Sequence, residues 1–207
     1  MRAPNPELER TIREQGFELL MEKEPEQITM RDIARICGVS ATAIYYYYAD
    51  KDALFERIKL DCIAAMEETI IARVQLCART DQRAGTLLRE GLEAFRDWAF
   101  ENPRVALLVM ERIKANKNAE PQELAGYYRA NAFAQELLEK AVAEGQACSD
   151  DPRRDSALAI AALWGAIEAI LRKRTWPEYW NDGIAFTDSM IEAIAQLVLI
   201  PTGGDKK

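Results

Sequence analysis

Apolar residues recur at helical spacing along nearly the whole chain, with charged residues between them. Leu8, Ile12, Gly16 and Leu19 follow the three- and four-residue steps of one helix face. No segment alternates apolar and polar residues with the period of two that a half-buried strand shows. The pattern therefore predicts an all-α fold.

Capping and helix-breaking residues divide this pattern into about nine helices. Pro25 ends the first helix, Thr29 and Asp50 are suited to cap the helices that follow them, and Gly38 is a typical helix stop. Residues 116–121 read as a loop, and Trp176 with Pro177 closes the helix before them. After the first helix, the expected helices cover residues 30–37, 41–47, 51–78, 81–102, 104–115, 122–144, 152–172 and 186–200.

The segment from Met30 to Tyr48 has the spacing of a helix-turn-helix. Gly38 can adopt the positive φ of a three-residue turn, Ser40 can cap the second helix, and Ala34 is small where two helices would cross closely. The apolar residues that would lock the two helices together are Ile33, Cys37, Val39 and Ile44. In such a unit the second helix enters the major groove of DNA.

The segment from Arg10 to Leu54 resembles the N-terminal domain of the TetR family of transcriptional regulators. The matching residues are Ile33-Ala34, Gly38-Val39-Ser40, Ile44-Tyr45, the aromatic residue at Tyr48, Lys51 and Leu54. The resemblance implies a three-helix DNA-binding domain over residues 1–50. A long fourth helix would join it to an effector-binding and dimerisation domain over residues 51–207.

The same resemblance assigns side chains to DNA. Ala41, Thr42, Ala43 and Tyr46 match positions that face bases, where a hydroxyl exchanges hydrogen bonds and an alanine methyl touches the methyl of thymine. The positions that match phosphate-binding residues are Thr29, Arg31, Tyr45, Tyr47 and Lys51. Of the tyrosines, Tyr48 is expected in the core, and Tyr45 is divided between core and phosphate.

Three positions depart from the family pattern. Glu24 stands where the family usually has a glycine, Tyr48 replaces a phenylalanine, and Tyr47 takes a position that is often histidine. Residues 1–54 also carry seven basic and ten acidic side chains, a net charge of −3 within a chain of net charge −7. We therefore expect weak non-specific DNA binding and a dependence on dimerisation.

Two helices near the C-terminus have faces suited to a dimer interface. Ala157, Ala161, Gly165 and Ala169 place small residues four apart, which lets another helix approach closely. The last helix adds an apolar stripe of Met190, Ile194, Leu197 and Val198. The pattern alone fits an internal core equally well, whereas the resemblance favours a two-fold homodimer on a palindromic operator.

Large apolar side chains gather on the middle helices, at Phe95, Trp98, Phe100, Leu107, Met110, Tyr127, Tyr128, Phe133 and Trp164. Most of them must form core, but a cavity among them would suit a small apolar or aromatic effector. Glu168 is the one charge in the apolar run from Ser156 to Leu171, so it should meet an arginine, meet a cationic ligand, or lie at an exposed edge. The expected ligand-binding residues are Phe95, Trp98, Leu107, Met110, Tyr127, Tyr128, Trp164 and Glu168.

Composition limits the other functions. The chain has no histidine, and its four cysteines are far apart in the sequence, so we expect no metal site, no cofactor and reduced thiols. No run of 18 apolar residues and no secretory signal are seen, which gives the cytoplasm as the expected location and no membrane partner.

Two other interpretations remain open at this point. One is an all-helical enzyme, in which carboxylates such as Glu111 and Glu168 would carry the chemistry, although nothing in their spacing marks them out. The other is a TetR-like protein that has lost DNA binding and acts as an interaction module. The acidic N-terminal domain and Glu24 keep the second of these open.

Overall fold

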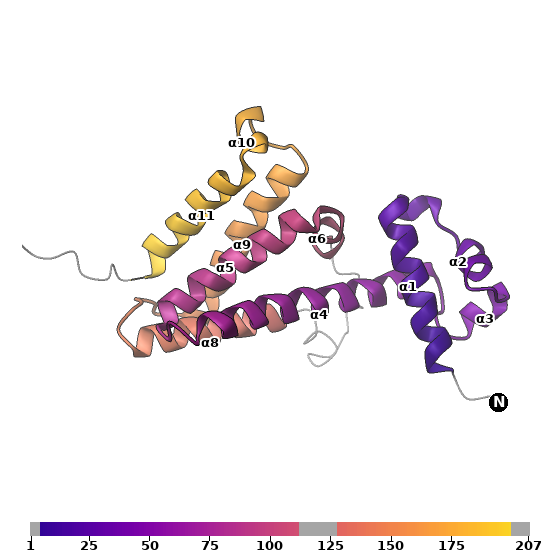
Figure 1. Ribbon diagram of the computed structural model, residues 1–207, viewed down its shortest axis with the longest axis horizontal. Helices are drawn as coiled ribbons and strands as arrows, with labels where there is room; N and C mark the ends of the chain where they lie inside the picture. The colour runs from indigo at the N-terminus through magenta and orange to yellow at the C-terminus, as the bar shows by residue number, and fades with distance from the viewer. Residues whose placement is uncertain (1–4, 112–127, 200–207) are drawn as a thin grey trace, which may run out of the picture. The chain divides into compact units, whose positions relative to one another are not determined.

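The computed structural model describes residues 5–111 and 128–199, and within these ranges the chain is helical (Figure 1). The predicted all-α fold is confirmed. The only extended pairing among these residues is a single bridge between Ala147 and Leu199. The helices are α1 (Pro6–Glu22), the 3₁₀ turn η1 (Pro25–Gln27), α2 (Met30–Ile36), α3 (Ala41–Tyr45), α4 (Lys51–Cys77), α5 (Ala84–Glu101), α6 (Pro103–Val109), α8 (Arg129–Ala143), α9 (Pro152–Leu171), α10 (Pro177–Asn181) and α11 (Gly183–Val198).

The described residues form two compact units that divide within α4. Unit 1 covers residues 5–62 and unit 2 begins at Ile63. None of the helices described is long and apolar enough to cross a membrane.

Unit 1 is built around the buried faces of α1, α2, α3 and the start of α4. Ile12, Ile33, Ile44 and Leu54 are fully buried, as their spacing predicts. Gly16 permits the close approach of α1 to α4, because a Cβ at this position would lie 2.7 Å from Cδ1 of Ile58. These contacts form the three-helix domain that the sequence predicts, closed by the first turns of the fourth helix.

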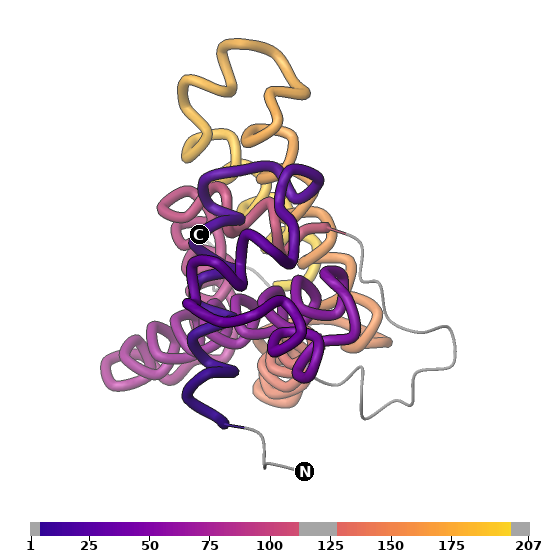
Figure 2. Tube along the Cα trace, turned by 90° about the vertical axis from the view of Figure 1, so that its right-hand side faces the viewer, coloured from indigo at the N-terminus to yellow at the C-terminus, as the bar shows by residue number. Residues whose placement is uncertain are grey.

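Unit 2 is a packed bundle in which α9 lies between α8 and α11, and α5 packs against α8, α9 and α11. Helices α9 and α11 run antiparallel and are joined through α10 at one end of the unit, as both views show (Figures 1 and 2). Leu138, Leu163, Ile167 and Ile191 are completely or almost completely buried. The bundle thus has its own apolar core.

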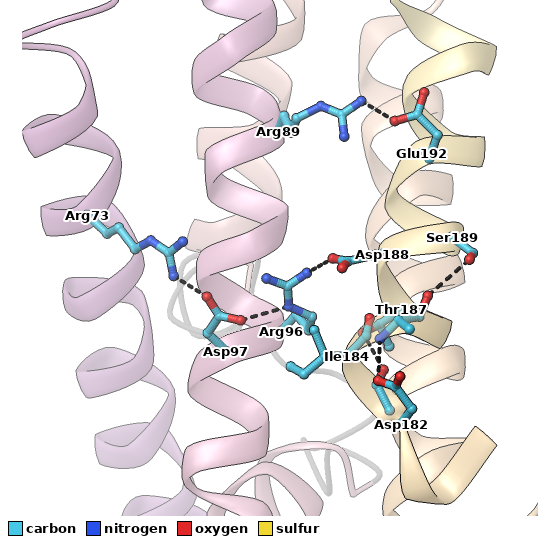
Figure 3. A network of polar contacts seen from close by, with 12 residues as sticks. Arg73, Arg89, Arg96, Asp97, Asp182, Ile184, Thr187, Asp188, Ser189 and Glu192 are labelled. Atoms are coloured by element: carbon cyan, nitrogen blue, oxygen red, sulfur yellow. Dashed lines mark hydrogen bonds and ion pairs between the residues drawn. The ribbon is translucent and has the colours of Figure 1, made fainter. Parts of the chain in front are cut away.

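A chain of charged groups connects three helices of unit 2 (Figure 3). Arg73 on α4 pairs with Asp97 on α5, whose other oxygen accepts a 2.7 Å bond from Arg96. Arg96 is only 7% exposed and also pairs with Asp188 on α11. Its buried guanidinium therefore has a carboxylate partner on each side, the partly buried Asp97 and the largely exposed Asp188.

Several helix boundaries differ from the sequence prediction. Helix α5 begins at Ala84 instead of residue 81, because the Asp81 carboxylate accepts the backbone N–H of Arg83 in a turn. Helix α11 begins at Gly183 instead of residue 186, because Asp182 caps it by accepting the N–H of Ala185.

Three short helices also differ from the sequence prediction. Helix α3 ends at Tyr45, two residues early, and α6 ends at Val109 instead of residue 115. Helix α10 was not expected, since Pro177 was read as a terminator; in the structure this proline opens a new turn. The expected loop at 116–121 and the start of the helix expected at 122 lie outside the described residues.

Candidate nucleic-acid interface and ligand cavity

Helix α2 begins with a reciprocal capping arrangement. The hydroxyl oxygen of Thr29 accepts the N–H of Asp32 at 3.2 Å, and the Asp32 carboxylate accepts the N–H of Thr29 at 3.1 Å. The bonds from the Thr29 side chain and then from its backbone lower the pKa of Asp32 below its ordinary value. The first helix of the motif is thus fixed by local polar contacts.

The turn between α2 and α3 follows equally from local chemistry. Gly38 has a φ of +67°, and the next residue, Val39, donates its N–H to the carbonyl of Ala34 at 3.0 Å. The hydroxyl oxygen of Ser40 accepts the N–H of Ala43 at 3.2 Å and so caps α3. Both predicted roles, the positive φ and the cap, are confirmed.

The side chains at and after the start of α3 form an exposed face. Thr42 is exposed, Tyr45 is 53% exposed and Tyr46 is 50% exposed, while Ala41 and Ala43 are half-buried. The Tyr46 ring packs edge-to-face against Tyr47, with centroids 5.4 Å apart, and a tyrosine can both stack and donate a hydrogen bond. This face is what a helix that reads a DNA groove presents.

Apart from Tyr45, the residues matched to phosphate contacts fall into two groups. Arg31 is exposed and forms no ion pair with any residue that the structure describes. Thr29, Tyr47 and Lys51 each have an internal bond: the Thr29 hydroxyl donates to Asp32, the Tyr47 hydroxyl accepts the N–H of Asn5 at 3.0 Å, and the Lys51 ammonium donates to the carbonyl of Pro25 at 2.8 Å. A lysine ammonium has three N–H donors, so two of those on Lys51 remain for a phosphate.

Two of the departures from the family pattern are structurally neutral. Glu24 has a φ of −68° in extended backbone, a conformation that does not need glycine. Tyr48 is 7% exposed, as predicted for the core, and its hydroxyl lies 3.4 Å from a carboxylate oxygen of Glu9. Neither substitution disturbs the motif.

Unit 2 contains a cavity of about 80 Å³ between α4, α5, α8 and α9. Its wall is largely apolar and includes Ile63, Leu92 and Phe133. The rings of Phe95 and Trp164 both line it, with centroids 5.7 Å apart. The lining of this space, apolar with few polar groups, is of the kind that small-molecule sites have.

One carboxylate interrupts the apolar wall. Glu67 on α4 is 1% exposed, and its Oε1 accepts the N–H of Ala130 at 2.7 Å. Its Oε2 is buried without a hydrogen bond and lies 3.4 Å from Nε of Arg129. Burial raises the pKa of Glu67, although the Ala130 amide and the Arg129 charge act in the opposite direction.

Comparison with known proteins agrees with this geometry. Residues 12–58 match the family model described as bacterial regulatory proteins, tetR family. A tetR-family regulatory protein from Rhodococcus RHA1 has a similar fold, with a TM-score of 0.66 at 20% identity over 94% of this chain and 98% of that one. Residues 12–58 are thus similar to bacterial regulatory proteins of the tetR family, and the described chain shares the fold of a solved member.

Two further comparisons are with a solved structure that matches most of the chain and with a curated protein that matches less than half of it. The structure of Thermus thermophilus FadR, described as a TetR-family transcriptional repressor in complex with lauroyl-CoA, has a TM-score of 0.65 at 15% identity and covers 95% of this chain and 99% of its own. The nucleoid occlusion factor SlmA of Haemophilus influenzae is 26% identical over 102 residues. That match spans 45% of this chain and 45% of SlmA, less than half the length of the curated relative. Members of the TetR family are transcription regulators and not enzymes.

The cavity includes only part of the set of ligand-binding residues expected from the sequence. Phe95 and Trp164 line it, whereas Trp98, Leu107 and Met110 do not. Tyr128 is 50% exposed and is not part of the wall, and Tyr127 lies outside the described residues.

Glu168 also lies away from the cavity. Its carboxylate accepts a 2.8 Å bond from Nε of Arg172, with Arg174 at 4.0 Å. Of the three possibilities left open for this residue, the arginine partner is the one observed.

Sequence reasoning missed Glu67, the one acidic residue in the cavity wall. It stands four residues after Ile63 and three before Ile70, so it shares a helix face with apolar residues that line the same cavity. The sequence feature that could have identified Glu67 is a charged residue on the otherwise apolar face of a long helix.

Proposed function

We propose that this transcriptional regulator is a ligand-responsive repressor that acts in the cytoplasm. In this proposal a homodimer binds a palindromic operator, and a small-molecule effector releases it. The observation that carries the proposal is the exposed α3 face with Thr42, Tyr45 and Tyr46, on a helix-turn-helix whose caps and turn are intact.

Base contacts are assigned to Ala41, Thr42, Ala43 and Tyr46, and phosphate contacts to Thr29, Arg31, Tyr45, Tyr47 and Lys51. The exposure of Tyr45 favours a phosphate over the core. Tyr47 and Lys51 are already held by Asn5 and Pro25, which would fix their side chains before DNA arrives and reduce the ordering cost of binding.

Dimerisation through α9 and α11 is supported by the surface of these helices. Leu158 is 61% exposed and Leu197 is 81% exposed. Ala161 is also exposed, and a Cβ at Gly165 would meet nothing within 4 Å, so one face of α9 is apolar, small and open. A second copy of the chain would cover this face, as the close approach of helices requires.

The charge of the DNA-binding unit makes this dimer necessary. A net charge of −3 over residues 1–54 leaves few cations to neutralise phosphates in one subunit. Two subunits on one palindrome act as linked binding sites, which raises affinity without new contacts in either half-site.

The effector response is assigned to the cavity of unit 2. The family resemblance to FadR, a repressor described with lauroyl-CoA, supports both the repressor role and a small-molecule ligand. Helix α4 begins at Lys51, just after the motif, and its residues Ile63 to Ile71 reach the cavity wall. A ligand that binds better to a form in which this helix is displaced would shift the dimer away from its operator.

Selection from a random duplex library tests the proposal. The purified protein at low salt should enrich one palindromic sequence, and a Thr42→Ala, Tyr46→Ala double variant should not. Tyr179→Ala is the matched control, because this tyrosine is similarly exposed but lies in unit 2; it should select the same site as the unmodified protein.

Two results would contradict the proposal. Failure of the unmodified protein to enrich any duplex would favour the interaction module instead. Equal enrichment by the double variant would show that binding does not use the α3 face.

A further inference from the structure

Only one of the two oxygens of the Glu67 carboxylate accepts a hydrogen bond. Oε1 accepts the N–H of Ala130 in the first turn of α8, which explains why a carboxylate can be buried at this point. Oε2 is equally buried but accepts no hydrogen bond. A buried acceptor without a donor is costly, so this oxygen marks a place where a donor from outside the protein would be favoured.

The nearest cation within the described chain does not fill this role. Nε of Arg129 lies 3.4 Å from Oε2 without the geometry of a hydrogen bond, and the Arg129 side chain is 53% exposed. Because its side chain is largely exposed, Arg129 can turn toward solvent once a ligand cation takes its place beside Oε2. Arg129 thus supports the ionised form of Glu67 without blocking it.

The rest of the cavity favours an apolar body with a positive charge. Phe95 and Trp164 present aromatic rings to the same space, and aromatic faces attract cations. The described wall is mostly apolar, with Asn131 as its uncharged polar side chain, and Glu67 would repel an anion.

We infer that the effector is a lipophilic cation, an apolar or aromatic molecule with an ammonium-like group that donates to Oε2 of Glu67. This inference rests on the proposed ligand response and specifies its chemistry. The cavity of about 80 Å³ is small beside the 300–1,000 Å³ of typical ligand sites, so it would have to widen around all but the smallest cations. Because Glu67 holds the start of α8, a cation on its other oxygen would act on α4 and α8 together.

A matched set of small probes tests the inference by direct binding. Phenethylamine, propylbenzene and 3-phenylpropionate have similar aromatic bodies, and they are cationic, neutral and anionic at neutral pH. Calorimetric titration of the full chain should give phenethylamine at least about a tenfold advantage over propylbenzene, the effect of one hydrogen bond to a charged group. The anion should bind more weakly than either.

Two single-residue variants test whether Glu67 is the source of the preference for the amine. Glu67→Gln should abolish the preference for the amine and leave propylbenzene affinity unchanged, because the amide keeps the shape and an acceptor for Ala130. Glu139→Gln, an exposed carboxylate on the same α8 helix that Glu67 holds, is the control and should change nothing. Circular dichroism checks that each variant is folded.

The inference is overturned if the unmodified protein binds propylbenzene as tightly as phenethylamine, or if folded Glu67→Gln keeps the preference for the amine. If Glu67→Gln does not fold, the binding of the three probes to the unmodified protein still decides whether the cavity prefers a cation. Binding is read without DNA, so failure of operator selection would count against the proposed function alone. If neutral and cationic compounds release the operator equally well, the inference of a cationic effector is wrong, while the proposed ligand response stands.

Discussion

The two units place their functional side chains by different physical means. In unit 1, Thr42, Tyr45 and Tyr46 lie on an exposed helix, positioned by caps and a turn that involve neighbours within five residues. In unit 2, the cavity wall is assembled from four helices far apart in the sequence, and its one acidic group, Glu67, is bonded to Ala130, 63 residues away. The first surface is therefore robust to changes elsewhere, whereas the second depends on the packing of the whole bundle.

This difference has a consequence for regulation. Short-range bonds keep the DNA-reading face formed whether or not a ligand is present. The cavity can change shape only if helices move, because packed interiors have two discrete arrangements more readily than a continuous range. A regulator needs both properties: a constant reading surface and a ligand site that responds.

The dimer surface gives the largest expected effect. Gly165→Glu places a charge on the open face of α9 and should make the protein monomeric, with operator affinity lower by roughly 10²-fold or more, since linked half-sites lose their advantage. Analytical ultracentrifugation and DNA-binding anisotropy measure the two effects. Glu139→Gln, at an exposed position of α8, is the control and should remain dimeric.

If Gly165→Glu is monomeric and still binds operator with undiminished affinity, DNA binding does not depend on the dimer surface of unit 2. Unit 1 would then read DNA without help from the unit 2 surface.

The second-largest effect is expected from shortening one fully buried side chain in the core of each unit. Ile44 and Leu163 are both fully buried, so Ile44→Ala and Leu163→Ala should each lower the free energy of unfolding by about 2–5 kcal/mol. Calorimetry measures stability, and anisotropy and probe titration measure the two activities. Ile44→Ala should impair DNA binding and spare phenethylamine binding, and Leu163→Ala should do the reverse. Equal loss of both activities in each variant would show that the units do not behave separately.

The cap of α2 gives the smallest effect. Thr29→Ala should cost unit 1 about 1 kcal/mol of stability. It should also raise the pKa of Asp32 toward its ordinary value, because the Thr29 side-chain bond is the largest cause of the lowering. A carboxyl whose pKa is lowered by folding stabilises the protein above its unfolded-state pKa, and this contribution disappears as the pH falls through the folded-state pKa.

Thermal unfolding at a series of acidic pH values should accordingly show a smaller acid-induced loss in Thr29→Ala than in the unmodified protein. An identical pH dependence would mean that the capping box does not act on Asp32.

The sequence predicted unit 1 well because its signals are local. Thr29, Gly38 and Ser40 each specify their own turn or cap, and the structure has each in the expected conformation. Tyr48 was correctly assigned to the core, because the motif that this segment resembles has an aromatic residue at this position. What the sequence left open was the tertiary use of side chains, such as the bond from Lys51 to Pro25.

The cavity was predicted less well because it is a product of packing. Phe95 and Trp164 line it, but Trp98, three residues from Phe95, does not, and sequence spacing alone does not separate these cases. Glu168 and Glu67 are both acidic residues in apolar helices, yet one meets Arg172 on its own helix end and the other lines the cavity. Only the arrangement of α4, α5, α8 and α9 distinguishes them.

The central claim is that a ligand in unit 2 controls DNA binding by unit 1. The most direct measurement is affinity for the selected operator, by anisotropy, with and without saturating phenethylamine, in the unmodified protein and in Glu67→Gln. The account predicts that the amine weakens operator binding by the unmodified protein at least about tenfold, within the usual range of coupling between sites, and leaves the variant unaffected. Unchanged operator affinity of the unmodified protein, with the amine shown to be bound, would contradict it.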